Sequence, residues 1–188
     1  SIIMKIEKKN NNQLQQTKKA DVIIGIDPDV EKNGVAFLER TSRKLEITTL
    51  GFADTLHYLC FVKRKSETAG QTFVVVIEAG WLNQGNWHYR YSDSKAKAAE
   101  LGRATGRNHQ TGMLLAEMCE HLKIPFVLQK PLKKIWKGKD RKITAEELKA
   151  FTGVVGRTNQ EGRDAALLAW EYAGLPIKIR PIQFVKTF

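Results

Sequence analysis

Cysteine is scarce in this sequence, whose 188 residues include only Cys60 and Cys119. Both lie in apolar stretches with helical spacing, so we expect buried, reduced thiols rather than a disulfide framework or a zinc site. No apolar run approaches the ~18 residues of a membrane span, no secretory leader opens the chain, and no internal repeat is present. These absences favour a cytoplasmic protein without a membrane partner.

Acidic residues are outnumbered: 20 Asp and Glu stand against 31 Lys and Arg, and the formal net charge is +11. Residues 1–20 carry +4 and residues 129–142 carry +6, which leaves +1 for the rest of the chain. Such concentrated positive charge suggests a polyanionic partner. The length and the 42% hydrophobic content predict one globular domain over residues 21–188. Residues 1–20 are expected to form a flexible tail, which either touches phosphate or only keeps the chain soluble.

Two buried strands are predicted to end in a carboxylate. Val22–Asp27 and Phe73–Glu78 are both rich in Val and Ile, as central strands are. Pro28, which cannot donate to a strand ladder, follows the first of them. Glu161 and Asp164 open a predicted helix three residues apart and so lie on one face. We expect the fold to bring these four carboxylates together at the end of the sheet, where α/β proteins place their chemistry.

Four carboxylates would form a costly cluster without cations. At ~4 Å and an effective dielectric of ~20, each like-charge pair costs about 4 kcal/mol. Carboxylate oxygens suit Mg²⁺ or Mn²⁺, and two such ions can activate a water and stabilise the leaving oxygen of a phosphodiester. Taken singly, each acid has a plainer interpretation as a turn former or as a favourable charge at a helix N-terminus.

The remaining pattern predicts a mixture of strands and helices. Asn33-Gly34 between two apolar runs is a strong signal for a hairpin turn, and Thr144 with Glu147 forms a capping box that opens a short helix. Apolar spacing predicts the other elements as strands over 35–39, 45–51 and 124–129, helices over 53–66, from Ser92 or Asp93 to about His121, and from Glu161 to before Gly174, and an extended arm over 177–188.

Large aromatic side chains gather in the Gly- and Asn-rich connection that follows Glu78. Their faces are able to stack on unpaired bases or to wedge into a nucleic-acid junction. Alternatively, some of them tuck under the loop as core, and Trp81 is the first choice for that role. The candidate nucleic-acid contacts in this connection are Trp87, Tyr89 and Arg90.

Residues 129–142 combine dense Lys and Arg with an interleaved Trp136. This composition favours contact with a phosphate backbone over a merely solvated surface. The candidate contacts in this basic segment are Lys133, Lys134, Lys137, Lys139, Arg141 and Lys142.

The predicted long helix contains three glycines, Gly102, Gly106 and Gly112. Each costs ~1 kcal/mol relative to Ala, which indicates close approach by another backbone, either of a partner helix or of nucleic acid. Arg103 and Arg107 on the same helix either face phosphate or form a plain solvated face.

Four stretches, taken in order, resemble the RuvC-type Holliday junction resolvases of the ribonuclease H-like superfamily. Residues 23–28 (Ile-Ile-Gly-Ile-Asp-Pro) are similar to the first-strand motif of that family, and residues 76–78 to its fourth strand. Residues 101–106 resemble the start of its long central helix, and residues 161–167 its final-helix acid pair. The resemblance covers the chain from about residue 21 to residue 173.

The resemblance implies an α/β, ribonuclease H-like fold with a five-stranded mixed sheet in the order 3-2-1-4-5, flanked by helices. It also implies a nucleoid-associated homodimer that resolves four-way DNA junctions by paired symmetric cuts. Lys142, with Lys139 next in line, would assist at the phosphate. The metal ligands, for Mg²⁺ or Mn²⁺ and with two ions per site, would be Asp27, Glu78, Glu161 and Asp164.

The chain also departs from the family. Asp29 stands where the family usually has Gly, and is either a fifth acid near the site or a turn residue. Glu161 stands where Asp or His is often found, and no Phe clearly matches the family's base-stacking residue. A nuclease of the same fold acting on an RNA–DNA hybrid or a flap, or a non-catalytic junction-binding protein, therefore stays an alternative. An actin-like nucleotide hydrolase would need a second Gly-rich phosphate loop after an Asp, which the sequence lacks.

Overall fold

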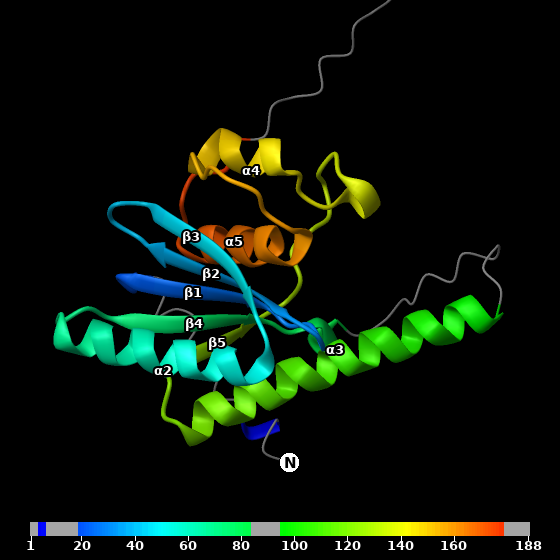
Figure 1. Ribbon diagram of the computed structural model, residues 1–188, viewed down its shortest axis with the longest axis horizontal. Helices are drawn as coiled ribbons and strands as arrows, with labels where there is room; N and C mark the ends of the chain where they lie inside the picture. The colour runs from blue at the N-terminus through cyan, green and yellow to red at the C-terminus, as the bar shows by residue number, and fades with distance from the viewer. Residues whose placement is uncertain (1–3, 7–18, 84–94, 179–188) are drawn as a thin grey trace, which may run out of the picture.

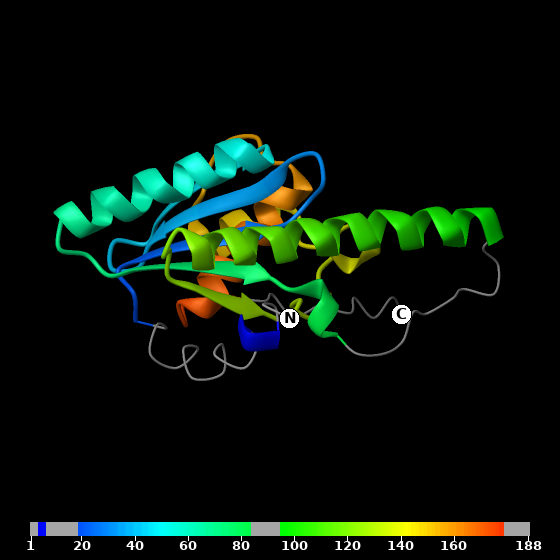
Figure 2. The same cartoon turned by 90° about the horizontal axis from the view of Figure 1, so that it is seen from below.

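The computed structural model describes residues 4–6, 19–83 and 95–178 as a sheet covered by helices on both faces (Figure 1). Two long helices lie on one face of the sheet, and two shorter helices lie on the other (Figures 1 and 2). In chain order these are α2 (Phe52–Thr68), α3 (Lys95–His121), α4 (Ala145–Thr152) and α5 (Gln160–Tyr172). Among these described residues, no helix is both long and apolar enough to cross a bilayer.

The five strands form a mixed sheet in the order β3-β2-β1-β4-β5. β1 (Val22–Asp27) pairs antiparallel with β2 (Asn33–Glu39) and parallel with β4 (Phe73–Glu78). β3 (Lys44–Leu50) and β5 (Phe126–Gln129) form the two edges. This confirms the strand order and the ribonuclease H-like sheet that the resemblance implied.

Burial on both faces explains why β1 has no polar residue before its last position. Ile24 and Ile26 pack against α2 and α3, in a core cluster that includes Leu59 and Leu115. Ile23 faces the opposite way, toward the cluster around Trp170 of α5. A strand covered on both sides needs apolar side chains at successive positions rather than at alternate ones. The buried run therefore ends only where the strand leaves the core, at Asp27.

The hairpin between β1 and β2 exists, but Asn33-Gly34 is not its turn. Both residues are already paired in β2, where Gly34 lies opposite Asp27. The turn consists of residues 28–32, and the carboxylate of Asp29 accepts backbone hydrogen bonds within it. The prediction of the turn position was therefore wrong, because the Asn-Gly pair serves packing, as described below.

Helix α3 runs past the edge of the sheet, so its N-terminal half projects from the body (Figure 1). A Cβ at Gly112 would meet the Trp81 ring at 2.7 Å and Pro28 at 3.2 Å, so side chains rather than a backbone approach the helix there. At Gly102 and Gly106, no atom of the described residues lies within 4 Å of such a Cβ. Close approach at these two glycines stays a prediction.

Most other predicted elements are confirmed within a few residues. Thr144 and Glu147 make the capping box, and α5 begins one residue before Glu161, capped by Asn159. Both cysteines are free thiols in helices, and Cys119 is buried as expected, whereas Cys60 is only half-buried. Ile6, within the expected tail, is buried in the core cluster under α2 and α3. The predicted caps Ser92 and Asp93 lie outside the described residues, as does the arm beyond residue 178.

Candidate active site

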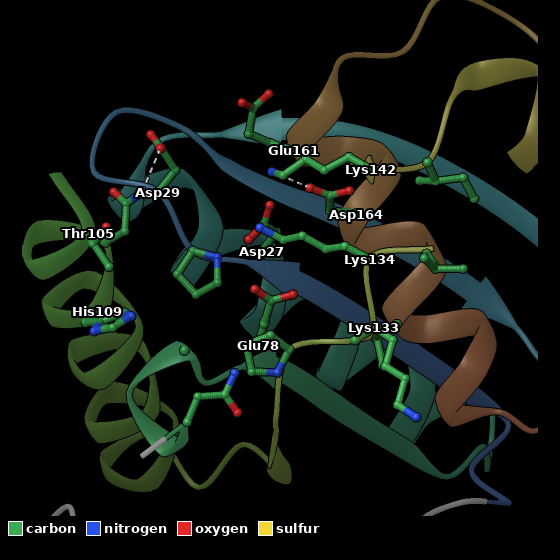
Figure 3. Close-up of a pocket in the computed structure, with 18 of the residues that line it drawn as sticks. Asp27, Asp29, Glu78, Thr105, His109, Lys133, Lys134, Lys142, Glu161 and Asp164 are labelled. Atoms are coloured by element: carbon green, nitrogen blue, oxygen red, sulfur yellow. Dashed lines mark hydrogen bonds and ion pairs between the residues drawn. The ribbon is translucent and has the colours of Figure 1, made fainter. Parts of the chain in front are cut away.

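Strands β1 and β4 deliver Asp27 and Glu78 to the same edge of the sheet. The two strands are parallel, and Ile26 lies beside Ile77 in the register, so the acids that follow are neighbours. Both carboxylates point into one pocket with a volume of about 1000 Å³ (Figure 3). The prediction that two strand-end acids meet is confirmed.

Helix α5 brings its acids to this edge because it lies directly on glycines of the sheet. A Cβ at Gly34 would collide with the backbone carbonyl oxygen of Glu161, and one at Gly25 with that of Ala165. Only glycine allows such contact. Since Gly34 lies opposite Asp27 in the sheet, the first turn of α5 is held beside the Asp27 carboxylate.

The four predicted acids do not contribute equally. In Figure 3, Asp27, Glu78 and Asp164 point toward one another, whereas the Glu161 side chain lies at the rim and points away from them. All four line the same pocket. The structure therefore brings three carboxylates together and leaves the fourth within the same cavity but apart.

Burial and mutual repulsion make ionisation of the inner acids unfavourable. The pKa of Asp27 is raised well above its ordinary value, first by burial and then by the charges of Glu78 and Asp164. The pKa of Glu78 is also raised, again by burial first and by Asp164 next. A cation beside these carboxylates would relieve the repulsion.

Two lysines from the basic segment place positive charge beside these acids. The Lys142 ammonium donates to Asp164 Oδ2 at 2.8 Å, and the side chains are 35% and 16% exposed. Although burial opposes it, this contact and the nearby acids raise the pKa of Lys142, which stays protonated. Lys134 also reaches into the pocket (Figure 3), and its charge lowers the pKa of Glu78 against the larger effect of burial.

Polar residues at the start of α5 hold Lys142 in place, and sequence reasoning missed them. Gln160 donates to Asp164 Oδ1 at 2.8 Å and to the carbonyl oxygen of Ile143 at 3.2 Å. Arg163 donates to the same carbonyl at 3.2 Å. The backbone directly after Lys142 is thus fastened to the helix that carries Asp164. The one signal that could have found them was the i, i+4 spacing of Gln160 and Asp164.

The basic segment is a folded loop rather than a loose run of charge. Trp136 is 8% exposed, and its ring stacks on Phe151 of α4 with centroids 5.9 Å apart. The Trp136 amide donates to the Arg141 carbonyl, and the Gly138 amide to that of Lys142. The buried tryptophan anchors the loop while most of its lysines stay exposed.

The predicted nucleic-acid contacts fall into four groups. Those that line the pocket are Lys133, Lys134, Arg141 and Lys142. Lys137 and Lys139 belong to the same loop but lie outside the lining, and Arg103 and Arg107 pair with Glu100 on the exposed side of α3. Trp87, Tyr89 and Arg90 lie outside the described residues.

Helix α3 and the connection after β4 form the far wall of the pocket. Thr105 and His109 face the cavity from α3 (Figure 3). Trp81 packs partly against the core, as predicted, and meets His109 edge to face at 6.4 Å. Burial lowers the pKa of His109, which favours a neutral imidazole. These wall residues had no signal in the sequence beyond helical spacing.

The donor set fits a divalent metal, although no group of three acidic, histidine or cysteine side chains in residues 4–6, 19–83 and 95–178 already has ligand geometry. Asp27, Glu78 and Asp164 offer hard oxygen ligands in a pocket where their own charges repel one another. The Lys142 ammonium currently satisfies one oxygen of Asp164. These three acids would hold the metal, with Glu161 next to them.

No family model and no curated protein matches this chain. Among solved structures it is similar to T. thermophilus RuvC in complex with a Holliday junction substrate, at 15% identity over 79% of this chain and 90% of that chain, with a TM-score of 0.47. It is also similar to Fowlpox virus resolvase in complex with junction DNA, at 16% identity over 81% and 97% of the two chains, with a TM-score of 0.32. The chain has a ribonuclease H-like fold. What its pocket does is decided by its own residues.

Proposed function

We propose that this protein is a metal-dependent endonuclease that cuts branched DNA, with the four-way junction as its substrate. One observation carries the proposal. Three mutually repelling carboxylates share a pocket with the ammonium groups of Lys134 and Lys142, which belong to an exposed basic loop. An acidic cluster that favours cations, next to a surface that favours phosphates, is suited to phosphodiester hydrolysis.

The residues divide the work by charge. Asp27, Glu78 and Asp164 would hold Mg²⁺ or Mn²⁺, which when bound activates a water and stabilises the leaving oxygen. Lys134 and Lys142 would bind the scissile phosphate and orient it over the acids. The exposed lysines of the loop, which include Lys137 and Lys139, would bind the DNA backbone on either side of the scissile phosphate. A homodimer would place two such sites on the symmetric arms of a junction.

A gel assay tests the proposal. A labelled mobile four-way junction, a linear duplex, a flap and an RNA–DNA hybrid are each incubated with Mg²⁺, Mn²⁺ or EDTA. We expect paired symmetric nicks in the junction alone, lost in EDTA. Cleavage of another substrate would keep the chemistry and change the substrate, and binding without any cleavage would make the protein a non-catalytic junction binder.

Asp27→Asn provides the inactive control for that assay. Replacing the central carboxylate should reduce cleavage by about 100-fold or more while leaving junction affinity nearly unchanged, because the phosphate contacts come from lysines. Glu117→Gln on the exposed face of α3 is the matched substitution that should have no effect. Loss of affinity together with cleavage in Asp27→Asn would indicate a folding defect instead.

A further inference from the structure

The turn that follows Asp27 is closed by the side chain of Asp29. Its Oδ1 accepts the backbone amides of Glu31 at 2.8 Å and Lys32 at 3.3 Å, and its Oδ2 accepts the side-chain amide of Asn108 at 3.3 Å. Its own backbone amide donates to Asn33 Oδ1 at 3.0 Å. Asp29 is therefore a turn residue with its oxygens engaged, and it is not a free fifth acid.

One side of the turn is anchored to helix α2 through a buried amide. Asn33 is fully buried, and its Nδ2 donates to the hydroxyl of Thr55 at 3.1 Å. That hydroxyl in turn donates to the carbonyl oxygen of Gly51 at 2.8 Å, at the start of α2. A buried, fully satisfied chain of this kind is rigid. It fixes the position at which β2 begins.

The other side of the turn is held by helix α3. Asn108 Oδ1 accepts the backbone amide of Val30 at 3.0 Å, while its Nδ2 donates to Asp29. One turn further along the same face of α3, Gly112 leaves room for the ring of Pro28, which a Cβ there would meet at 3.2 Å. Helix α3 thus touches each of the three residues after Asp27.

The carboxylate of Asp27 has no such support of its own. No hydrogen bond from the described residues reaches it. Its acidic neighbours in the pocket, Glu78 and Asp164 above all, repel it, and Lys142 attracts it only through its charge. Its position therefore follows the position of its backbone, which the turn and α3 determine. A displacement of about 1 Å at a reacting group is enough to cost ~100-fold in rate.

We propose that Asp29 and Asn108 are positioning residues, which tie the Asp27 carboxylate to helix α3 so that this helix controls metal binding and turnover at the acid cluster. The inference rests on the proposed function and deepens it. It also gives the projecting half of α3 a role, since any partner that aligns this helix would act on Asp27 through the same pair.

Two single substitutions break the pair without changing side-chain size. D29N places two amides face to face, and N108D places two carboxylates face to face. For each, we expect kcat on the junction to fall about 10- to 100-fold with KM within about twofold of wild type. Mn²⁺ affinity, measured by the EPR signal of the free ion in the absence of DNA, should weaken at least about fivefold. Q110E, at an exposed position on α3, is the matched control for the added charge and should behave as wild type.

The exchange variant D29N/N108D restores the pair in reverse. The amide at position 29 can then donate to the carboxylate at position 108, which still accepts from the Val30 amide, while the amide oxygen at position 29 accepts from the turn. We expect kcat and Mn²⁺ affinity to return to within about threefold of wild type. A residue that serves only general stability would not produce a kcat effect that reverses in this way at constant KM.

Three results would overturn the proposal: single variants with wild-type kcat and Mn²⁺ affinity, losses that only follow the unfolded fraction seen by circular dichroism, or an exchange variant that recovers melting temperature without kcat. If the wild-type protein cuts no junction, the proposed function fails. The Mn²⁺ series then still decides whether Asp29 and Asn108 position Asp27.

Discussion

Lys142 is the residue at which the acid cluster and the basic segment meet. Its ammonium lies against Asp164, and the carbonyl of the next residue, Ile143, is held by Gln160 and Arg163. Under the proposed function, the positive charge that offsets the acids before a metal binds would be available to a phosphate afterwards. One side chain would then serve both the stability of the metal-free protein and the chemistry.

Replacing the Lys142 ammonium should lower the free energy of unfolding mainly while no metal is bound. Lys142→Met leaves the Asp164 carboxylate without its partner, and we expect a loss of about 2 kcal/mol, below the 3–5 kcal/mol of fully buried pairs because the lysine is 35% exposed. Saturating Mg²⁺ should recover most of this loss, as measured by urea unfolding. Equal losses with and without Mg²⁺ would contradict the offsetting role, and Lys142→Arg is the charge-retaining control.

The two cysteines should differ sharply in reactivity. Burial raises the pKa of Cys119 to about 12, so almost no thiolate exists at ordinary pH, whereas Cys60 is partly exposed. We expect a disulfide reagent at about pH 8 to react with one thiol per chain in the native protein, and with two in denaturant. In the folded Cys60→Ala variant, no thiol should react. Reaction of two thiols in the native protein would show that the Cys119 side chain, on α3, is not buried in the core.

The place of a single residue in the site was predictable from the sequence where a residue type suited to the chemistry stood at an informative position in an element. Asp27 and Glu78 end apolar strands, and packing alone rarely places a charged residue there. Asn108 and Arg163 had no such signal, because polar residues on a helix are ordinary and their partners are far away in the sequence. The role of Asp29 was open for the same reason: its partner Asn108 is 79 residues distant.

At the scale of elements, the approach of α5 to the sheet decides whether a site exists. The helix backbone rests on Gly25 and Gly34 of β1 and β2. On α5 itself, Gly162 faces the side chain of Ile47, which a Cβ there would meet at 2.5 Å. Small residues on both surfaces bring the acids of the helix within reach of those of the strands.

A methyl group at Gly34 should separate these elements. Gly34→Ala places a Cβ against the Glu161 carbonyl, and we expect about 1–3 kcal/mol of destabilisation in urea unfolding from overpacking. Mn²⁺ affinity should fall as well, because Asp164 moves away from Asp27. Gly51→Ala, where nothing lies within 4 Å of the added Cβ, is the control for the methyl group and should leave Mn²⁺ affinity unchanged, with a stability loss of no more than about 1 kcal/mol because Ala caps α2 less well than Gly. Equal effects at both positions would refute the packing argument.

The basic loop should act on DNA affinity independently of the acids. Lys137→Ala with Lys139→Ala should weaken junction binding and reduce the slope of log affinity against log salt by ~0.9 for each phosphate that the loop no longer neutralises. Fluorescence anisotropy at several NaCl concentrations measures both quantities. Lys65→Ala, in the last turn of α2, is the control. An unchanged slope would exclude the loop from phosphate contact.

Helices and strands were predicted well from the periodicity of apolar residues. The prediction was poor where one residue type can have either of two structural roles. The strands and helices follow from apolar spacing, because burial against one or two faces imposes it. Asn33-Gly34 is a strong turn signal, yet here the glycine admits α5 and the asparagine is buried against Thr55. That choice depends on a helix more than 120 residues later, which local sequence does not contain.

For the whole molecule, the acid cluster should make stability depend on pH and, under the proposed function, on metal. The pKa values of Asp27 and Glu78 are raised in the folded protein, so between the ordinary pKa of a carboxyl group and these raised values it binds more protons than the unfolded chain. Metal-free stability should therefore fall as pH rises above about 4, the ordinary pKa of a carboxyl group. This dependence runs opposite to that of a salt-bridged acid.

Mg²⁺ should reverse this loss. Binding at about 100 times the dissociation constant adds about 2.7 kcal/mol, and thermal unfolding between about pH 4 and 8 with Mg²⁺ or EDTA measures it. Asp27→Asn should flatten the metal-free pH dependence and abolish most of the Mg²⁺ effect. NaCl at equal ionic strength is the control, and an equal gain from NaCl would mean that screening, not a metal site, is responsible.

The position of α5 late in the chain also matters during synthesis. Asp27 and Glu78 leave the ribosome early, while Asp164 follows only after a further 85 residues and the whole of the basic loop. Until then, the face of the sheet that α5 covers has no cover. A nascent chain, or one that ends before Asp164, can therefore hold the strand acids but never the full cluster, so any activity that needs all three inner carboxylates should begin only after α5 has been made.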